Sequence, residues 1–347
     1  MPRKVKTPKV KKPCTATSPL DVLSNLPAHV LDDILICLPL RDAVRTSILS
    51  NKWRFNWCRP PALMLDQTLW DTTNENINFV TRFTDIIYHI MAFHVGPITK
   101  FILSIADIIL NHIQINEPKL KSFDFTGNVD LISLKKVPVL VKLSLADTVE
   151  PSWKAGQPDL SKYFESFPTL ELLHLNFHSV QFLSAGSVDI AAKLSAPLNC
   201  LKSLCLSDIC LDESVELSVV LCLIRSSPYL QDIQIKFDYS ALDKLVVPVS
   251  GDVVNEIPAS FMGVTLNHLR SVKLEGISGT ETEIEFIKLL LAKSSMLVRM
   301  LIQPKIENET AETRLKVLAE ITKFPRASTK AEVDYRLDDN CVLVSSQ

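Results

Sequence analysis

Residues Leu23 to Trp53 read LSNLPAHVLDDILICLPLRDAVRTSILSNKW, and their apolar spacing predicts two short helices separated by a proline. The first helix would place its apolar residues on one face, at Val30, Leu31, Ile34, Leu35 and Leu38. Pro39 ends it, because proline lacks an amide hydrogen and disfavours helical geometry in the residue before it. A second helix repeats the spacing at Ala43, Val44, Ser47 and Ile48. A unit of about forty residues is too small to bury all of these side chains by itself. The rest of the chain, a partner protein, or both must therefore cover them.

The composition predicts a protein with a large apolar core and one or two domains. The chain has 347 residues, of which 47% are hydrophobic and 22% are charged. No apolar run approaches the roughly 20 residues of a membrane-spanning helix, and no apolar segment of a signal peptide follows the basic start. We therefore expect a reducing compartment, which agrees with eight scattered cysteines that form no Cys-x-x-Cys pair.

Residues 1–20 form a basic tail that we expect to be disordered. Six lysines and arginines fall between Arg3 and Lys12, whereas the whole chain has a net charge of −2. Such a tail fits a nuclear-import signal, a weak phosphate-backbone anchor or a solubilising segment. We expect the protein in the nucleus, the cytoplasm or both, and a nucleic-acid partner is the weaker alternative.

The body of the chain repeats the phrase Leu-x-x-Φ-x-Φ, in which Φ is apolar. The copies start at Leu120, Leu140, Leu170, Leu201, Leu230, Leu269 and Leu297, and a variant starts at Ile98. A recurring strand phrase of this kind predicts a solenoid of parallel strands with helices or loops on its outer side. Copies that lie only 20 residues apart leave no room for a full helix between their strands. The fold class is therefore α/β, with uneven spacing between the repeats.

Other segments predict the helices of this solenoid. One helix would lie near residues 76–94 and cap a first strand at 62–66, since a terminal repeat has no neighbour on one side. A second would begin at Asp212 and end before Pro228, with Asp212 as its cap. A third would begin at Thr280 or Thr282, with Glu283 in its first turn.

The sequence contains no recognisable catalytic or metal motif, so we expect a protein that is not an enzyme and has no cofactor. It lacks a glycine-rich phosphate loop, a His-Glu-x-x-His motif and a Gly-x-Ser-x-Gly motif. Cys200, Cys205 and Cys210 lie five residues apart, but the residues between them fit core positions, so we expect no zinc site. His174 and His178 are expected to point outward from one strand.

Strand alternation predicts which side chains face solvent on the sheet. In the copy LQDIQI, Ile233 and Ile235 point into the core, so the residues between them point outward. The resulting row is chemically mixed, and it suits a protein partner better than nucleic acid. The candidate target-binding residues are Leu172, His174, Asn176, Asp232, Gln234, Lys236, Lys273 and Glu275.

The opening segment resembles the F-box of plant proteins that combine an F-box with leucine-rich repeats. The resemblance rests on Leu26-Pro27, Val30-Leu31, Ile34-Leu35, Leu38-Pro39, Leu40 to Val44, Thr46-Ser47, Leu49-Ser50 and Trp53-Arg54. The segments LRSVKLEGISGTETEIEFIKLLLAKSSMLVRMLIQP and FPRASTKAEVDY resemble the FBD segment that closes many of these proteins. The implied domains are an F-box at 21–61, a leucine-rich-repeat solenoid at 62–263, an FBD segment at 264–340 that continues the solenoid, and a tail at 341–347. Between Ile105 and Leu120 the family usually has more repeats, so the repeat region is shortened.

The resemblance implies the substrate-recognition subunit of an SCF-type cullin ubiquitin ligase. The F-box would dock on a Skp-type adaptor, which binds the cullin, and the repeats would bind an unknown target protein. The alternative is a nuclear interaction scaffold that recruits no ligase. The implied adaptor-binding residues are Leu26, Pro27, Val30, Leu31, Ile34, Leu35, Leu38, Pro39, Val44, Ser47 and Trp53.

Overall fold

The computed structural model describes residues 23–66, 79–105, 112–148, 159–185, 193–238, 263–305 and 310–337. The chain divides into two compact units, residues 1–60 and residues 61–347. We call them the helical unit and the repeat unit and describe each by itself. The predicted basic tail, the end of the FBD segment beyond residue 337 and residues 341–347 lie outside the described residues.

The helical unit consists of short helices whose ends are set by prolines. Its helices are η1 (Leu23–Asn25), α1 (Ala28–Ile36), α2 (Leu40–Arg45), η2 (Thr46–Ile48) and η3 (Asn56–Cys58). Pro27 and Pro39 stand immediately before α1 and α2 in extended backbone, with ψ of 147° and 141°. The predicted pair of helices separated by a proline is therefore confirmed, although 3-10 geometry replaces the α-helix after Arg45.

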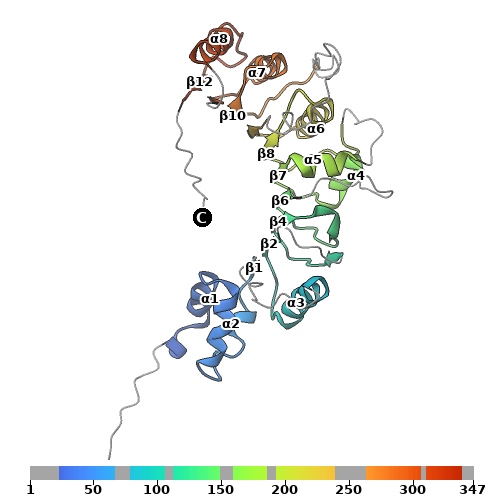
Figure 1. Ribbon diagram of the computed structural model, residues 1–347, viewed down its shortest axis with the longest axis vertical. Coiled ribbons are helices and arrows are strands. Elements are labelled where there is room, and N and C mark those ends of the chain that lie inside the picture. Colours follow the sequence, from blue (N-terminus) through green and yellow to red (C-terminus); the bar gives the residue numbers. More distant parts are fainter. Residues whose placement is uncertain are drawn as a thin grey trace, which may run out of the picture. The chain divides into compact units, whose positions relative to one another are not determined.

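The described residues of the repeat unit form a parallel sheet with ten strands, and these strands follow one another in chain order. Their bounds are β1 (Ala62–Leu65), β2 (Lys100–Ser104), β4 (Ser122–Gly127), β6 (Lys142–Asp147), β7 (Leu172–Asn176), β8 (Ser203–Ile209), β9 (Asp232–Phe237), β10 (Ser271–Ile277), β11 (Arg299–Pro304) and β12 (Glu332–Tyr335). Within this unit the strands form one row and α4 to α8 lie on its outer side (Figure 1). The α/β fold class and the solenoid of parallel strands are confirmed, and every copy of the repeated phrase forms a strand.

Each copy of the phrase packs in the same way. The leading leucine is buried, and its N–H donates to the carbonyl oxygen of the residue three positions earlier, which closes a turn. In one copy, the N–H of Leu230 donates to the carbonyl of Ser227 at 3.2 Å. The two apolar residues of the strand point to the same core, and Ile233 and Ile235 are both buried as predicted. The register aligns these positions across strands, so Ile233 stands beside Leu204 and Val272. This continuous apolar layer is what each repeat buries against its neighbours.

In the described residues, α-helices lie on the outer side in several of the connections between strands of the sheet. They are α3 (Phe79–Phe93), α4 (Leu160–Tyr163), α5 (Phe177–Ser184), α6 (Ser214–Arg225), α7 (Glu281–Lys293) and α8 (Ala311–Ile321). The helix predicted near 76–94 is confirmed as α3. Between β4 and β6, where the copies are 20 residues apart, the chain forms only η5 (Val129–Leu131) and β5 (Ile132–Leu134). The strand β5 pairs with β3 (Ile113–Ile115) in a second, two-stranded sheet.

The start of α6 differs from the prediction. Its N-cap residue is Glu213, and no side chain caps it. Asp212 instead accepts a hydrogen bond from the hydroxyl of Thr280 at 3.1 Å, so its carboxylate joins two repeats. Thr280, in turn, is the N-cap of α7 and settles the choice between Thr280 and Thr282.

Candidate interaction surfaces

The helical unit has a small core of its own. Leu31 and Leu35 of α1 pack with Ala43 and Trp53, and Leu26 and Trp57 are partly buried against them. Leu31 is only 6% exposed and Leu35 only 2%. Leu31, Leu35 and Trp53 were predicted as adaptor contacts, but the structure places them inside the unit. We therefore assign them to the support of the surface and not to the surface itself.

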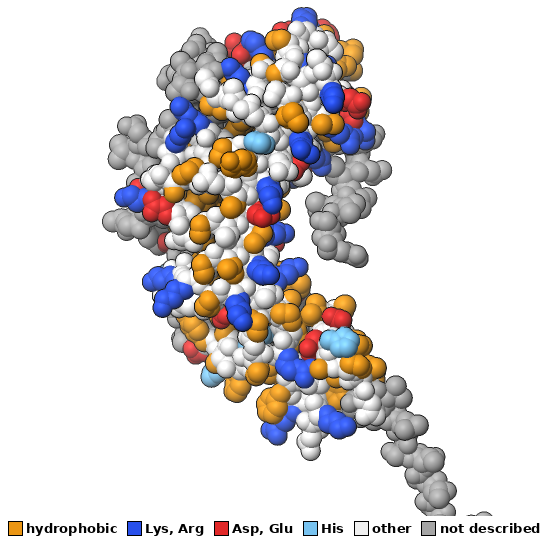
Figure 2. All heavy atoms as spheres, turned by 180° about the vertical axis from the view of Figure 1, so that it is seen from behind, with side chains coloured by type: hydrophobic (Ala, Val, Ile, Leu, Met, Phe, Trp, Pro, Cys, Tyr) orange, Lys and Arg blue, Asp and Glu red, His pale blue; other side chains and the backbone are white. Residues whose placement is uncertain are grey.

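Other predicted residues of this unit lie at its surface. Ile34 is 39% exposed, Leu38 37% and Val44 38%, and the prolines that precede α1 and α2 are exposed as well. Leu26, Val30 and Ser47 are half-buried, and the Ser47 hydroxyl donates to the carbonyl of Val44 at 2.5 Å. On the face of this unit seen in Figure 2, hydrophobic side chains lie at the surface among lysines and arginines.

Additional apolar side chains are exposed that the sequence prediction did not include. They are Leu23, Ile36, Ile48, Leu49 and Phe55, and Ile48 is 86% exposed. Ile48 has the i, i+4 spacing from Val44, which in an α-helix would place both on one face. The chain tightens to a 3-10 helix at Thr46, with about three residues per turn, so this spacing no longer aligns the two side chains. A surface with so many exposed apolar residues is typical of a protein-binding site.

Arg59, near the end of the helical unit, forms an ion pair with α1. Its guanidinium donates to the carboxylate of Asp32 at 2.8 Å, and it lies 3.5 Å from the carbonyl oxygen of Ala28. Both charged side chains are partly exposed, so the pair contributes about 1 kcal/mol or less to stability. The ion pair fixes where the chain leaves the unit, close to the start of α1.

The sheet face opposite the helices presents the second candidate surface. Gln234 and Lys236 of β9 are exposed and Asp232 is half-buried, as strand alternation predicts. Burial raises the pKa of Asp232, and the nearby charge of Arg270 opposes this. Lys236 lies 3.7 Å from Asp208, and the amino group of Lys273 lies 3.0 Å from the Glu275 carboxylate. Lys236, Lys273 and Glu275 therefore form ion pairs with neighbouring side chains of the repeat unit.

Asn176 is half-buried, and its side chain bonds to backbone groups of its own chain, a role that the prediction did not include. Its side-chain oxygen accepts from the N–H of Asp147 at 3.0 Å, and its amide group donates to the Asp147 carbonyl at 2.7 Å. The same oxygen accepts from the N–H of Ser179 at 3.1 Å and so caps α5. Asn176 therefore joins two repeats. A polar residue at the end of an apolar strand and directly before a helix was the signal for this role.

The two histidines that were predicted on one strand lie on different elements. His174 lies on β7, half-buried, and its Nδ1 lies 2.9 Å from the hydroxyl of Ser144. His178 was expected on the same strand, but it lies in α5 because the strand ends at Asn176. Burial lowers the pKa of His174, although the charge of Asp124 opposes this. Burial therefore favours the neutral form of the His174 imidazole.

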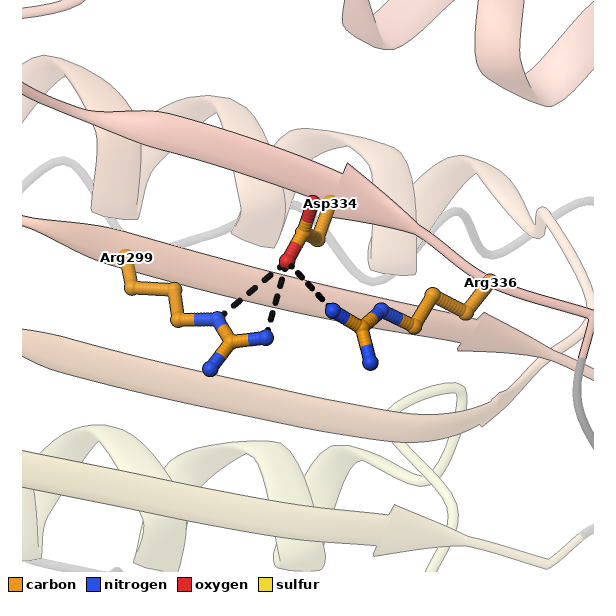
Figure 3. A network of polar contacts seen from close by, with 3 residues as sticks. All are labelled: Arg299, Asp334 and Arg336. Carbon is orange, nitrogen blue, oxygen red and sulfur yellow. Dashed lines mark hydrogen bonds and ion pairs between the residues drawn. The ribbon is translucent and has the colours of Figure 1, made fainter. Parts of the chain in front are cut away.

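An ion-pair network closes the far end of the sheet. Arg299 donates from Nε at 3.2 Å and from Nη2 at 2.9 Å to one oxygen of Asp334, and Arg336 reaches the same oxygen at 3.2 Å (Figure 3). The two arginines come from β11 and from the residue after β12. These bonds lower the pKa of Asp334, with the hydrogen bond from Arg299 as the main cause. The network joins the last two strands, β11 and β12, beyond their backbone ladder.

Within the described ranges, no cluster of three or more His, Cys, Asp or Glu side chains is arranged to hold a metal ion. Among the same residues, no helix is both long and apolar enough to span a membrane. Glu216 is 1% exposed, and burial raises the pKa of its carboxyl group to about 8. It accepts from the N–H of Cys210 at 2.7 Å, at the start of α6. We assign Glu216 a structural role, because in the described residues its carboxylate accepts a hydrogen bond from a backbone group.

Two family models match the chain. A model described as F-box domain matches residues 23–62, and a model described as FBD matches residues 262–302. The first range covers the helical unit with its exposed apolar residues. The second covers β10, α7 and most of β11, so the predicted extension of the FBD segment to residue 340 stays a prediction.

Curated proteins with similar sequences come from Arabidopsis thaliana. An F-box/FBD/LRR-repeat protein is 22% identical over 419 positions, which include 92% of this chain and 99% of that protein. A second F-box/FBD/LRR-repeat protein is 45% identical over 65 residues, which are 19% of this chain and 14% of that protein. F-box/LRR-repeat protein 13 is 30% identical over 171 residues, which are 49% of this chain and 34% of that protein.

The first of these alignments also shows a difference in length. Its 419 positions exceed the 347 residues of this chain by 72, so the relative contains segments that this chain lacks. This agrees with the shortened repeat region expected from the sequence.

Proposed function

Because this chain belongs to the F-box proteins that combine an FBD segment with leucine-rich repeats, we propose that it selects target proteins for an SCF-type ubiquitin ligase. In this proposal the helical unit binds a Skp-type adaptor, and the adaptor binds the cullin. The sheet face of the repeat unit binds the target. The chain itself forms no bond with ubiquitin, so it is a non-catalytic subunit.

The exposed apolar surface of the helical unit is the observation that supports binding to an adaptor. The unit already fills its core with Leu31, Leu35, Ala43 and Trp53, so the exposed residues are surplus to folding. Covering them with a partner removes apolar surface from water, which stabilises a complex by roughly 25 cal/mol for each Å² buried. Side chains that lie at the fully desolvated centre of such a contact contribute most of its binding energy.

The geometry of the sheet supports the proposal that the repeat unit binds a target protein. Strands in register place their outward side chains in rows that cross the strands from β1 to β12. Solenoids present such extended faces to protein partners. The ion pairs on this face, Lys236 with Asp208 and Lys273 with Glu275, leave it without an excess of either charge. A charge-balanced face does not favour a polyanion, so a protein target is the better fit.

A pull-down with a purified Skp-type adaptor tests the proposal. The full chain is compared with the double variant Ile34→Glu and Val44→Glu, which places two charges on the exposed apolar surface. We expect binding at least about 30-fold weaker in the double variant, as for loss of a hot spot. Leu315→Glu is the matched control, since Leu315 is 64% exposed but lies on α8 in the repeat unit. Equal binding by all three proteins would contradict the proposal.

A further inference from the structure

Three lysines lie close together near the start of the ten-stranded sheet. Lys100 begins β2 and Lys142 begins β6, and the register places both beside Ser122 of β4. Lys121 directly precedes β4, and its carbonyl oxygen accepts from the N–H of Lys142 at 2.9 Å. Neighbouring strands lie about 4.8 Å apart, so the backbones of Lys100 and Lys142 are about 10 Å apart, with Ser122 between them. We call these four residues the lysine patch.

The lysine patch belongs to the sheet face opposite the outer helices. The residues that follow Lys100 and Lys142 in their strands, Phe101 and Leu143, are buried in the core. Because successive side chains of a strand point to opposite faces, the two lysines point away from this core. Lys100 is exposed and Lys142 is half-buried. A partner that approaches this face can therefore reach both ammonium groups.

The positive charge of the lysine patch exceeds the negative charge around it. In the part of the chain that the structure describes, none of the three lysines forms an ion pair. Asp124, two residues after Ser122, adds one negative charge on the same face against three positive charges. Farther along the sheet, Glu171 already pairs with Lys202 at 2.9 Å, and the lysines of β9 and β10 pair as described above. The excess of positive charge is therefore local to the start of the sheet.

We propose that the lysine patch binds an acidic segment of the target protein, whose Asp or Glu carboxylates lie over Ser122 between Lys100 and Lys142. A carboxylate in this position faces two ammonium groups, and hydrogen bonds between such ions are stronger than those between neutral groups. The Ser122 hydroxyl, which has no hydrogen-bond partner among the described residues, supplies a further donor. An acidic segment also lowers the repulsion among the lysines, which a basic segment would increase.

A short acidic segment of a protein fits the lysine patch better than a nucleic acid does. A nucleic acid presents a continuous row of phosphates and needs positive charge along an extended groove. Here the excess of positive charge spans only β2, β4 and β6, and the strands that follow have paired charges of both signs. This inference rests on the proposed function for the existence of a target and adds the chemistry of the recognised segment.

The experiment selects peptides without knowledge of the target. A library of random displayed peptides is panned on the full chain, and recovered peptides are tested on the double variant Lys100→Glu and Lys142→Glu. The control is the double variant Lys316→Glu and Lys323→Glu, which changes the net charge equally at two exposed lysines of α8 and of the residues after it. Circular dichroism checks that both variants are folded. Photo-crosslinking of the peptides to the parent chain, mapped by mass spectrometry, gives a readout that needs no variant.

We expect the peptides whose binding depends on the lysine patch to contain at least two Asp or Glu residues. Their binding should fall at least tenfold in the Lys100 and Lys142 double variant and less than threefold in the control. Added salt should weaken binding to the parent chain, because it screens exposed charges. Crosslinks should map to β2, β4 and β6.

Patch-dependent peptides without acidic residues would overturn the inference, as would crosslinks elsewhere or the absence of patch-dependent peptides. A short single-stranded oligonucleotide is measured in the same assay, and patch-dependent binding tighter than that of the peptides would also overturn it. The adaptor is absent from the panning, so a failed adaptor pull-down would contradict the proposed function and leave this result unchanged.

Discussion

Glu216 and Glu283 occupy the same position, the third residue of the outer helices α6 and α7, but the backbone satisfies their carboxylates differently. Both are buried. The Glu283 carboxylate accepts from the N–H groups of Ser278, Gly279 and Thr280, at 3.1, 2.6 and 3.0 Å. In the described part of the chain, Glu216 accepts only from the N–H of Cys210, and its Oε1 has no hydrogen-bond partner. The two carboxylates should therefore affect stability in opposite directions.

We expect Glu216→Gln to stabilise the protein at pH 8 and Glu283→Gln to destabilise it. Burial raises the pKa of Glu216 to about 8 from its ordinary value of about 4.5, while the hydrogen bond from Cys210 opposes this rise. The folded chain thus retains a proton that the unfolded chain releases, so stability falls as the pH rises from about 4.5 through 8. Glu216→Gln removes that loss and should gain about 1–3 kcal/mol at pH 8, whereas Glu283→Gln should lose about 1–3 kcal/mol.

Urea unfolding at pH 5, 6.5 and 8 measures this difference. The parent should lose stability relative to Glu216→Gln over that range. A constant difference between the two proteins from pH 5 to pH 8 would show that Glu216 does not titrate in this window.

Gly276 is required by the backbone at the irregularity of β10. Its φ is +81°, and a Cβ at this position would lie 2.6 Å from the carbonyl oxygen of Phe237. Gly276→Ala should therefore cost about 2 kcal/mol or more, since neither the torsion nor the close backbone atom can adapt freely. Gly263→Ala is the matched control, because nothing lies within 4 Å of its Cβ position. Thermal unfolding compares the two, and equal midpoints would refute the constraint.

Asn176 should behave as a structural residue. Asn176→Ala removes its bonds to both backbone groups of Asp147 and the cap on α5, and it leaves buried partners unsatisfied. We expect a loss of about 1–3 kcal/mol in denaturant unfolding. Gln234→Ala, an exposed position on β9, should change stability by about 0.5 kcal/mol or less. Comparable losses in both variants would mean that Asn176 does not join the repeats.

Most strands of the repeat unit could be predicted from the sequence, because the spacing of apolar residues in each copy of the phrase identifies its buried positions. The strand β12 was missed, since Ala331 replaces the leading leucine and only one residue separates it from Val333. The strands β3 and β5 were missed as well, because three residues give too short a pattern. In the same way, a stripe such as Val30, Leu31, Ile34 and Leu35 predicts a helix but not which members meet the core. Which side chains meet the core depends on where Trp53 packs, and the local sequence pattern does not predict this.

Leu31 and Ile34 should therefore separate folding from binding. Leu31→Ala creates a cavity in the core of the helical unit and should cost about 2–5 kcal/mol. Ile34→Ala removes a side chain that is 39% exposed, so it should change stability by less than about 1 kcal/mol while it weakens adaptor binding. Near-ultraviolet circular dichroism of the tryptophans follows the first effect. Similar stability of both variants would contradict the assignment of Leu31 to the core.

Isothermal titration calorimetry of the full chain with a purified Skp-type adaptor, at several temperatures, tests the central claim most directly. Burial of apolar surface gives a negative change in heat capacity on binding. The exposed residues Ile34, Leu38, Val44 and Ile48 would become covered in the complex. The predicted result is a complex of one chain with one adaptor and a clearly negative heat-capacity change, which the double variant Ile34→Glu and Val44→Glu abolishes. No saturable binding by the folded parent chain, or binding with a heat-capacity change near zero, would contradict the account.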